Sequence, residues 1–398
     1  MLHDRVLMRG PSGENVDRNL PRGLWFAIRP PRNAPHITRT VPDLSSSSSQ
    51  SAPSHGAGEL RSVHVDDYNV ELREDGAFLG DRANKKAFQA ILDRWRQKLG
   101  DADPLRDVST QKLYKQKREL EKILLHGDPV AAGVLIGAIE EFSHSLTQVV
   151  ERFLQLPAWR DTRRIVIGGG FREGRIGELV VGRTAVLLRR AEKPVELLPI
   201  RHHPDAAGLL GSTELAPDWA RSGFDGILAA DIGGTNIRAG VVELGSRPGA
   251  AEIWKSERWR HADDQPERDE AVEALIAMLR ELIGAAQAEK FRLAPFIGIA
   301  CPGIIRPDGT IARGAQNLPG DWESADFNPP ARMVRAIPQI HGRDTLVIMH
   351  NDAVVQGLSE VCLMRDVAQW GILTVGTGLG NAHFTNRGRE AQSNGRPV

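Results

Sequence analysis

Two glycine-rich stretches are the clearest candidates for chemistry in this sequence, because each follows an apolar run typical of a strand. The first is Asp231-Ile232-Gly233-Gly234-Thr235-Asn236, and the second is Gly376-Thr377-Gly378-Leu379-Gly380. Glycines let backbone N–H groups approach a phosphate closely, and the Thr and Asn side chains add further donors. A tight turn without a ligand explains either stretch about as well. Two such stretches favour a polyphosphate, since donors must converge on it from both sides.

Two aspartates stand where apolar runs end. Asp231 opens the first glycine stretch and could hold Mg²⁺, most simply through water. Asn351-Asp352 follows the run 345–349 and precedes a helical pattern over 353–364. An Asp in this place is a good helix N-cap, which needs no ligand. The functional alternative is a general base that accepts the proton of a substrate hydroxyl during phosphoryl transfer.

The composition of the chain excludes several other classes of protein. Its 398 residues hold 51 Lys plus Arg and 51 Asp plus Glu, so a basic surface for nucleic acid has no support. The two cysteines, Cys301 and Cys362, form no CxxC pair, which excludes a disulfide framework and a Cys-rich zinc site. No stretch approaches the roughly 18 apolar residues of a membrane span. A cytoplasmic enzyme with a small-molecule substrate, no nucleic acid and no membrane partner is expected, and a homodimer is left open.

Apolar patterning predicts an α/β protein after a disordered tail over residues 1–60. Strands are expected at 164–167, 195–200, 227–230, 238–244, 296–300, 345–349 and 370–375, and helices at 84–98, 111–126, 129–154, 177–190, 267–286 and 353–364. Several of these strands deliver glycine and polar residues at their carboxyl ends. That is the usual arrangement of a ligand site in an α/β fold.

The order of these motifs resembles the ROK family of sugar kinases and repressors, which includes bacterial glucokinases. Further similar segments are Cys301-Pro302-Gly303 with Gly309, Asn317-Leu318-Pro319-Gly320 with Trp322, and Asn351-Asp352 with Glu360. The resemblance covers about 226–385 and implies a two-lobed actin/hexokinase-like (ribonuclease H-like) ATPase fold. It also implies ATP and Mg²⁺ as cofactors, both glycine stretches on the ATP phosphates, Asp352 as base, and Asn351 and Asn317 on a sugar.

The segment before residue 226 resembles the C-terminal half of the same family. Its matching pieces are Gly127-Asp128-Pro129 with the helix that follows, 164–170, and 205–212. The resemblance places Gly169 and Gly170 beside the adenosine. The segment order therefore indicates a circularly permuted chain. Its larger lobe would comprise 61–204 plus 366–398, and its smaller lobe 205–365.

One departure from the family affects the acceptor. The family carries a Glu-x-Gly-His sugar-binding motif and a Cys-rich zinc site after the second glycine stretch, whereas this chain continues Asn381-Ala382-His383 and soon ends. His383 is read as a stray polar residue, and no winged-helix pattern supports a repressor. We therefore expect phosphoryl transfer from ATP to a hexose-like hydroxyl. The alternative is a catalytically weak or inactive nucleotide- or sugar-sensing protein.

Overall fold

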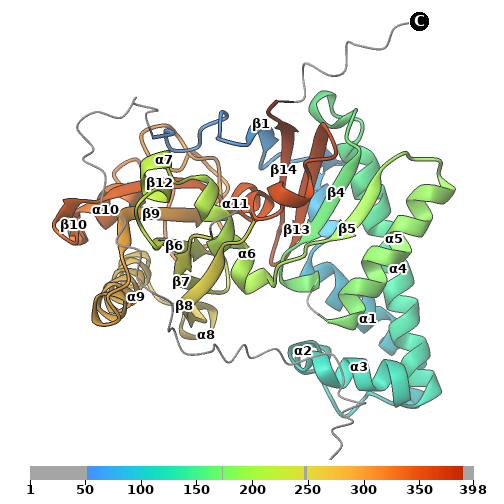
Figure 1. Cartoon of the computed structure of the whole chain (residues 1–398). Helices are drawn as coiled ribbons and strands as arrows, with labels where there is room; N and C mark the ends of the chain where they lie inside the picture. Colours follow the sequence, from blue (N-terminus) through green and yellow to red (C-terminus); the bar gives the residue numbers. More distant parts are fainter. Residues whose placement is uncertain (1–51, 173, 246–248, 389–398) are drawn as a thin grey trace, which may run out of the picture. The chain divides into compact units, whose positions relative to one another are not determined.

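The computed structural model describes residues 52–172, 174–245 and 249–388. Two five-stranded sheets, with helices packed on them, make up this part of the chain (Figure 1). We call them sheet I and sheet II.

Sheet I is built from one continuous stretch of chain. Its strands are β6 (Gly226–Ile232), β7 (Ile237–Glu243), β8 (Glu252–Trp259), β9 (Leu293–Cys301) and β12 (Leu346–Asn351). They lie in the order β12-β9-β6-β7-β8. β6, β7 and β8 form an antiparallel meander, while β9 and β12 run parallel to β6. The predicted apolar runs are thus the central strands of this sheet, and β6 and β9 are buried along their whole length.

Sheet II has the same pattern but takes its strands from both ends of the chain. Its strands are β1 (Val63–Tyr68), β4 (Arg164–Gly168), β5 (Glu196–Pro199), β13 (Gln369–Val375) and β14 (Leu379–Asn386). They lie in the order β1-β14-β13-β4-β5. β13, β14 and β1 are antiparallel neighbours, and β4 and β5 run parallel to β13. Three antiparallel and two parallel strands in each sheet confirm the predicted actin/hexokinase-like α/β fold.

The helices cover both sheets, and two of them lie between the sheets. Helices α1 (Lys85–Leu99), α4 (Pro129–Phe153) and α5 (Arg175–Arg190) share one hydrophobic core with sheet II, whereas α9 (Arg268–Ala288) and α10 (Pro329–Ala336) share another with sheet I. Helices α6 (Pro204–Gly211) and α11 (Asp352–Leu358) lie between the sheets and join a third core (Figure 1). The shorter elements are α2 (Thr110–Lys115), α3 (Lys117–His126), α7 (Asp218–Arg221), α8 (His261–Asp264), β2 (Arg73–Glu74), β3 (Ala77–Phe78), β10 (Gln339–Ile340) and β11 (Arg343–Asp344).

Three predicted helix limits are corrected by the structure. The helix expected over 111–126 is interrupted at Gln116, where φ is −100° and ψ is +63°, so α2 and α3 are separate. The helix expected over 353–364 ends as an α-helix at Leu358 and is followed by a 3-10 turn, Val361–Leu363. Helix α5 begins at Arg175, two residues before the predicted start. Strands β1, β8 and β14 were not predicted.

Residues 55–57 form a strap along β12, although the sequence places them in the predicted tail. The amide of Gly56 donates to the Met349 carbonyl (3.0 Å), and the Met349 amide donates to His55 Nδ1 (3.1 Å). His350 Nε2 lies 3.1 Å from the Ala57 carbonyl. The predicted tail boundary near residue 60 is therefore too late. The tail prediction for residues 1–51 lies outside the described residues, and the division of the rest into two lobes stays a prediction.

Within the described ranges, no single helix is both long and apolar enough to cross a membrane. One bent pair, Arg118–His126 with Pro129–Phe153, satisfies the length and composition criteria with an angle of 115° between its parts.

Candidate functional site

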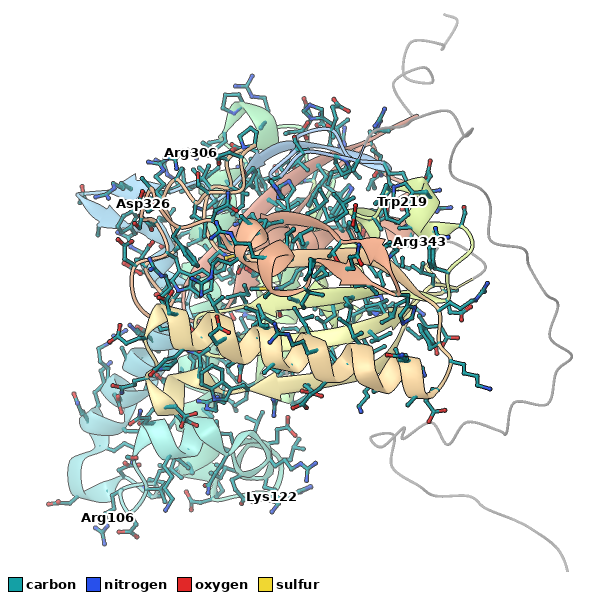
Figure 2. The ribbon with its side chains drawn as sticks, turned by 90° about the vertical axis from the view of Figure 1, so that its left-hand side faces the viewer. Arg106, Lys122, Trp219, Arg306, Asp326 and Arg343 are labelled. Atoms are coloured by element: carbon teal, nitrogen blue, oxygen red, sulfur yellow. The ribbon has the colours of Figure 1, made fainter. Side chains whose placement is uncertain are left out.

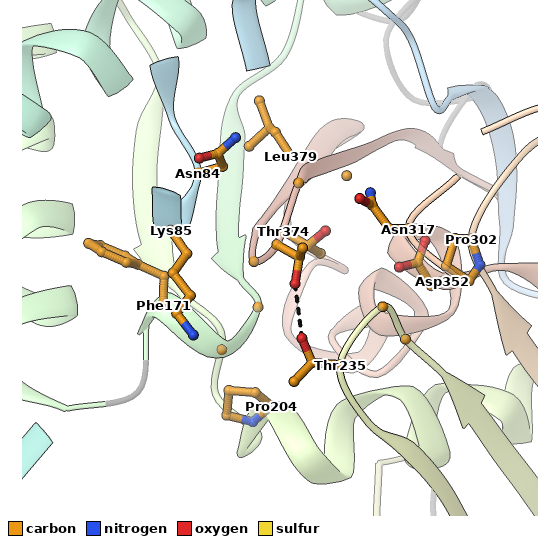
Figure 3. A pocket seen from close by; sticks show the side chains of 18 of the residues that line it. Asn84, Lys85, Phe171, Pro204, Thr235, Pro302, Asn317, Asp352, Thr374 and Leu379 are labelled. Carbon is orange, nitrogen blue, oxygen red and sulfur yellow. Dashed lines mark hydrogen bonds between the residues drawn. The ribbon is translucent and has the colours of Figure 1, made fainter. Parts of the chain in front are cut away.

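Both glycine stretches and Asp352 line one cavity of about 1210 Å³ (Figure 3). Its walls come from sheet I, sheet II and helices α1 and α6. Of the residues predicted for the site, the following line this cavity: Asp231, Gly233, Gly234, Thr235, Asn236, Gly376, Thr377, Gly378, Gly380, Gly169, Gly170, Asn317 and Asp352. Asn351 is the one predicted site residue that does not.

The first glycine stretch is the turn between β6 and β7. The amide of Gly233 donates to the Asn236 carbonyl (2.9 Å), which closes the turn. His261 Nε2 lies 2.8 Å from the Gly233 carbonyl and supports the turn from α8. This contact anchors the turn to α8. His261 was not singled out in the sequence, because it lies outside any motif.

The second glycine stretch is the turn between β13 and β14, and it meets the first. The amide of Gly376 donates to the Gly378 carbonyl (2.9 Å), and the Lys85 amide donates to the Gly376 carbonyl (2.9 Å). Thr235 Oγ1 and Thr377 Oγ1 are 3.0 Å apart, in hydrogen-bond contact (Figure 3). The two turns therefore face each other, as a shared phosphate ligand would require.

Gly169 and Gly170 lie at the end of β4 and line the same cavity. Gly169 has φ +81°, and a Cβ there would lie 2.5 Å from the Val375 carbonyl oxygen. Only glycine fits both the backbone conformation and the close approach to β13. A Cβ on Gly170 would meet nothing within 4 Å, so that position is open.

Asp231 is buried and belongs to a chain of charges. Arg238 donates to Asp231 Oδ2 (2.9 Å) and to Asp205 Oδ1 on α6, and Arg258 donates to Asp205 Oδ2 (2.7 Å). Burial raises the pKa of the Asp231 carboxyl, against the opposing charge of Arg238. Within the described residues, no group of three His, Cys, Asp or Glu side chains could hold a metal by itself. Arg238 occupies Asp231 Oδ2, so Oδ1 is the oxygen that could join ligand phosphates around Mg²⁺, which is the common mode for this ion.

Asp352 is the first residue of α11 and is partly exposed to the cavity. Burial, and then the nearby charge of Asp231, raise the pKa of Asp352 from 3.8 to about 7. A carboxyl with a pKa near 7 can take up a proton at neutral pH, which is what a general base requires.

Asn351 lies behind Asp352 and is 1% exposed. Its Oδ1 accepts from the amides of Ala353 (2.9 Å) and Val354 (3.2 Å), and its Nδ2 donates to the Gly303 carbonyl (3.0 Å). The side chain therefore caps α11 and anchors the 301–303 segment. Its predicted contact with a sugar gains no support from this position.

Asn317 lies between the two glycine turns. A Cβ on Gly234 would lie 3.0 Å from Asn317 Cβ, and one on Gly378 would lie 3.4 Å from Asn317 Nδ2. Figure 3 shows this side chain on the same side of the cavity as Asp352. Asn317 is thus placed to contact either the transferred phosphate or the acceptor.

His383 has no place in the cavity. It is fully buried, with Nδ1 2.7 Å from Asp66 Oδ2 and Nε2 3.1 Å from Thr162 Oγ1. The residue holds β14 to β1 and to the segment before β4, so it has a structural role and is not the stray polar residue that the sequence suggested. Lys85, Asn69 and Arg260, by contrast, line the cavity and were not predicted, because no motif surrounds them.

Comparison with known proteins finds a family model that is similar to part of the chain. The model of the ROK family matches residues 227–391. Similar solved structures include a Listeria monocytogenes protein proposed to be an N-acetylmannosamine kinase, with 25% identity over 40% of this chain and 47% of that chain, at a TM-score of 0.31. A proposed sugar kinase from Cytophaga hutchinsonii has 22% identity over 40% of this chain and 48% of that chain, at a TM-score of 0.31.

An exopolyphosphatase-like protein has 13% identity over 61% of this chain and 86% of that chain, at a TM-score of 0.30. None of the curated proteins matches the sequence. This chain spans about half the length of the two kinases it matches.

Proposed function

We propose, from the premise that residues 227–391 belong to the ROK family, that the protein transfers the terminal phosphoryl group of ATP to a hydroxyl group of a hexose-like sugar. The observation that carries the proposal is the convergence of two glycine turns and one carboxyl of raised pKa on a single cavity. Each feature alone has a structural explanation, but neither a glycine turn nor the first residue of a helix requires the other two features nearby.

In this reaction the residues have separate tasks. The turns with Thr235 and Thr377 hold the phosphates, and Asp231 holds Mg²⁺, which offsets phosphate charge when bound. Gly169 and Gly170 leave room for the adenosine, since neither presents a side chain to the cavity. Asp352 takes the proton of the attacking hydroxyl, and its raised pKa makes it a stronger base than an ordinary carboxylate.

The test is ADP release from MgATP by the purified protein, with a panel of hexoses, N-acetylhexosamines and water alone as acceptors. Asp352→Asn keeps the shape of the side chain and removes the base. We expect sugar-dependent release that falls about a hundredfold or more in this variant, the scale of a lost general base. Asp107→Asn, at an exposed position away from the cavity lining, is the matched control and should keep full activity.

A different result would point to the sensing alternative. ATP binding without release for any sugar would contradict the kinase. The capping role of Asn351 favours this alternative, because that side chain is not offered to a sugar.

We further propose that the chain is a circular permutation of a fold with two equivalent sheets. In sheet I the antiparallel meander is continuous, whereas in sheet II the link between its second and third strands is replaced by the two chain ends. Val63 and Asn386 are direct partners across β1 and β14, so a short hairpin can join them. A variant with this join and new termini between Ser222 and Gly226 should fold and keep ATP binding. Failure to fold while the parent chain is stable would count against the proposal.

A further inference from the structure

We propose that Asn69 is an acceptor-contacting residue, whose side-chain amide donates a hydrogen bond to an oxygen of a polyhydroxylated acceptor beside Asp352. This inference rests on the proposed function and assigns one wall of its acceptor site. Asn69 comes from the loop after β1, far in sequence from every motif that suggested the activity.

The backbone of Asn69 is held in a conformation that few residues adopt. Its φ is +53°, in the left-handed region, where non-glycine residues are uncommon and often mark functional sites. A single buried residue, Asn381 on β14, fixes the loop. The Asn381 carbonyl accepts from the Asn69 amide (3.0 Å), Asn381 Oδ1 accepts from the Val70 amide (2.9 Å), and Asn381 Nδ2 donates to the Val70 carbonyl (3.0 Å).

The side-chain amide of Asn69 is a buried donor with no partner among the described residues. Its Nδ2 rests against Gly314, where a Cβ would lie only 2.5 Å from this nitrogen. Gly314 and its neighbour Gly303 have φ values of +91° and +103°, so both positions need glycine. A buried donor is rarely left unpaired without a reason, such as a missing ligand.

Asn69 and Gly314 contact each other in the wall of the cavity that also contains the proposed base, Asp352. Asn69 belongs to a loop of sheet II, and Gly314 to the segment that follows β9 of sheet I. Gly314 packs on Gly303, whose carbonyl accepts from the side chain of Asn351, the residue before Asp352. Asn69, Gly314 and Asp352 all line the cavity. In the proposed complex, one acceptor contacts both the amide of Asn69 and the carboxyl of Asp352.

The amides and carboxyl groups of the lining suit an uncharged ligand rich in hydroxyl groups, although the same cavity also holds cations such as Lys85, Arg258 and Arg260. Asn69 and Asn317 offer amides, while Asp352 and Glu71 offer carboxyl groups that accept from hydroxyls. An acidic or phosphorylated acceptor would place its charge beside these carboxyls. A neutral sugar would satisfy the Asn69 donor and supply the hydroxyl whose proton Asp352 accepts.

Two variants test the assignment. Asn69→Asp keeps the shape and tolerates the left-handed backbone, but it replaces the donor with an acceptor. Asn69→Gly removes the side chain and relieves the backbone. Asp75→Gly is the matched control, because Asp75 also has a left-handed φ (+51°) but is exposed and does not line the cavity.

Two measurements are needed on each variant. The first is KM for the sugar and for ATP in the ADP-release assay. The second is sugar binding without ATP, by calorimetric titration with D-glucose, D-mannose and their N-acetylated amino derivatives. We expect both Asn69 variants to raise the sugar KM and Kd about tenfold, the size of one lost hydrogen bond at a buried site. ATP KM should change less than about twofold, and Asn69→Gly should unfold at the same temperature as the parent or higher.

Each outcome separates this inference from the proposed function. Turnover with an unchanged sugar KM and Kd in both Asn69 variants overturns the inference and leaves the kinase standing. Sugar binding that is weakened in both variants, without turnover in the parent, overturns the kinase and supports the inference. If none of the sugars binds the parent protein, the acceptor assignment of Asn69 is wrong. A loss shared by Asp75→Gly would also overturn it, since only the backbone change is common to the two sites.

Discussion

Asp352→Asn should lower activity about a hundredfold and yet stabilise the protein, by an amount that depends on pH. Burial and the charge of Asp231 raise the pKa of Asp352 from 3.8 to about 7, so ionising this carboxyl opposes folding at every pH above 3.8. The sign follows from proton binding: between these two pKa values the folded state binds more protons than the unfolded state, so stability falls as pH rises. At 1.36 kcal/mol per pH unit, the opposing free energy is about 4 kcal/mol at pH 8 and about 0.6 kcal/mol at pH 4.

Asparagine removes this charge and keeps the oxygen that accepts from the Ala353 amide (2.9 Å). We therefore expect a gain in unfolding free energy of up to about 4 kcal/mol at pH 8 and almost none at pH 4. For a chain of this size, the gain at pH 8 corresponds to a rise in Tm of roughly 5 °C. Urea unfolding and calorimetry at pH 4, 6 and 8 measure both quantities, with the exposed Asp107→Asn as control for the loss of one negative charge.

Two results would refute this reasoning. An equal effect of Asp352→Asn at pH 4 and pH 8 would mean that the carboxyl does not titrate differently in the folded and unfolded states. A loss of stability at pH 8 would mean that the charge is paired in the folded protein. We therefore expect the variant to be more stable than the parent and about two orders of magnitude less active. This combination is typical of a catalytic group whose buried charge destabilises the folded state.

Three further predictions follow from the same geometry. The kcat/KM of the parent protein should fall tenfold per pH unit below about pH 7, because Asp352 must be ionised to act as base, and a flat profile between pH 5 and 8 would exclude it. Gly169→Ala should destabilise the fold by about 2 kcal/mol or more, since its Cβ would lie 2.5 Å from the Val375 carbonyl, whereas Gly170→Ala should stay within about 0.5 kcal/mol in urea titrations. Arg238→Met should cost about 3 kcal/mol in the same assay, because it leaves the buried Asp231 carboxyl without its cation; an unchanged midpoint would contradict this.

The features that could be predicted from the sequence are those set by residues close together in the chain, such as an apolar strand and the glycine turn after it. The two glycine turns follow strands that are buried along nearly their whole length, such as β6 and β13, so an apolar run and its glycine end were both visible. Strand β14 was missed because three of its buried residues are polar: Asn381, His383 and Asn386. Their partners lie elsewhere in the chain, as in the contact of His383 with Asp66. A polar strand that is buried by such pairing looks like a loop in the sequence.

The resemblance to a family gave the fold, but it could not give the part each side chain plays. Asn351 stands next to the proposed base in the sequence, which made a substrate contact plausible. In the fold it ends β12 and is the N-cap of α11, so its side-chain oxygen caps the helix and its side-chain amide donates to the Gly303 carbonyl. Asp352, one residue later, faces the cavity instead. A change from strand to helix at one residue decides which of two adjacent polar side chains reaches the ligand, and sequence motifs do not resolve that step.

The acceptor wall was the least predictable part, because its residues meet only through the pairing of chain ends. Asn381 shows how this pairing links two parts of the cavity wall. It directly follows Gly380 of the second glycine turn, and its own side chain and carbonyl hold Asn69 and Val70 in place. One buried amide thus joins the second glycine turn to the loop that carries Asn69, although Asn381 and Val70 lie 311 residues apart in the chain.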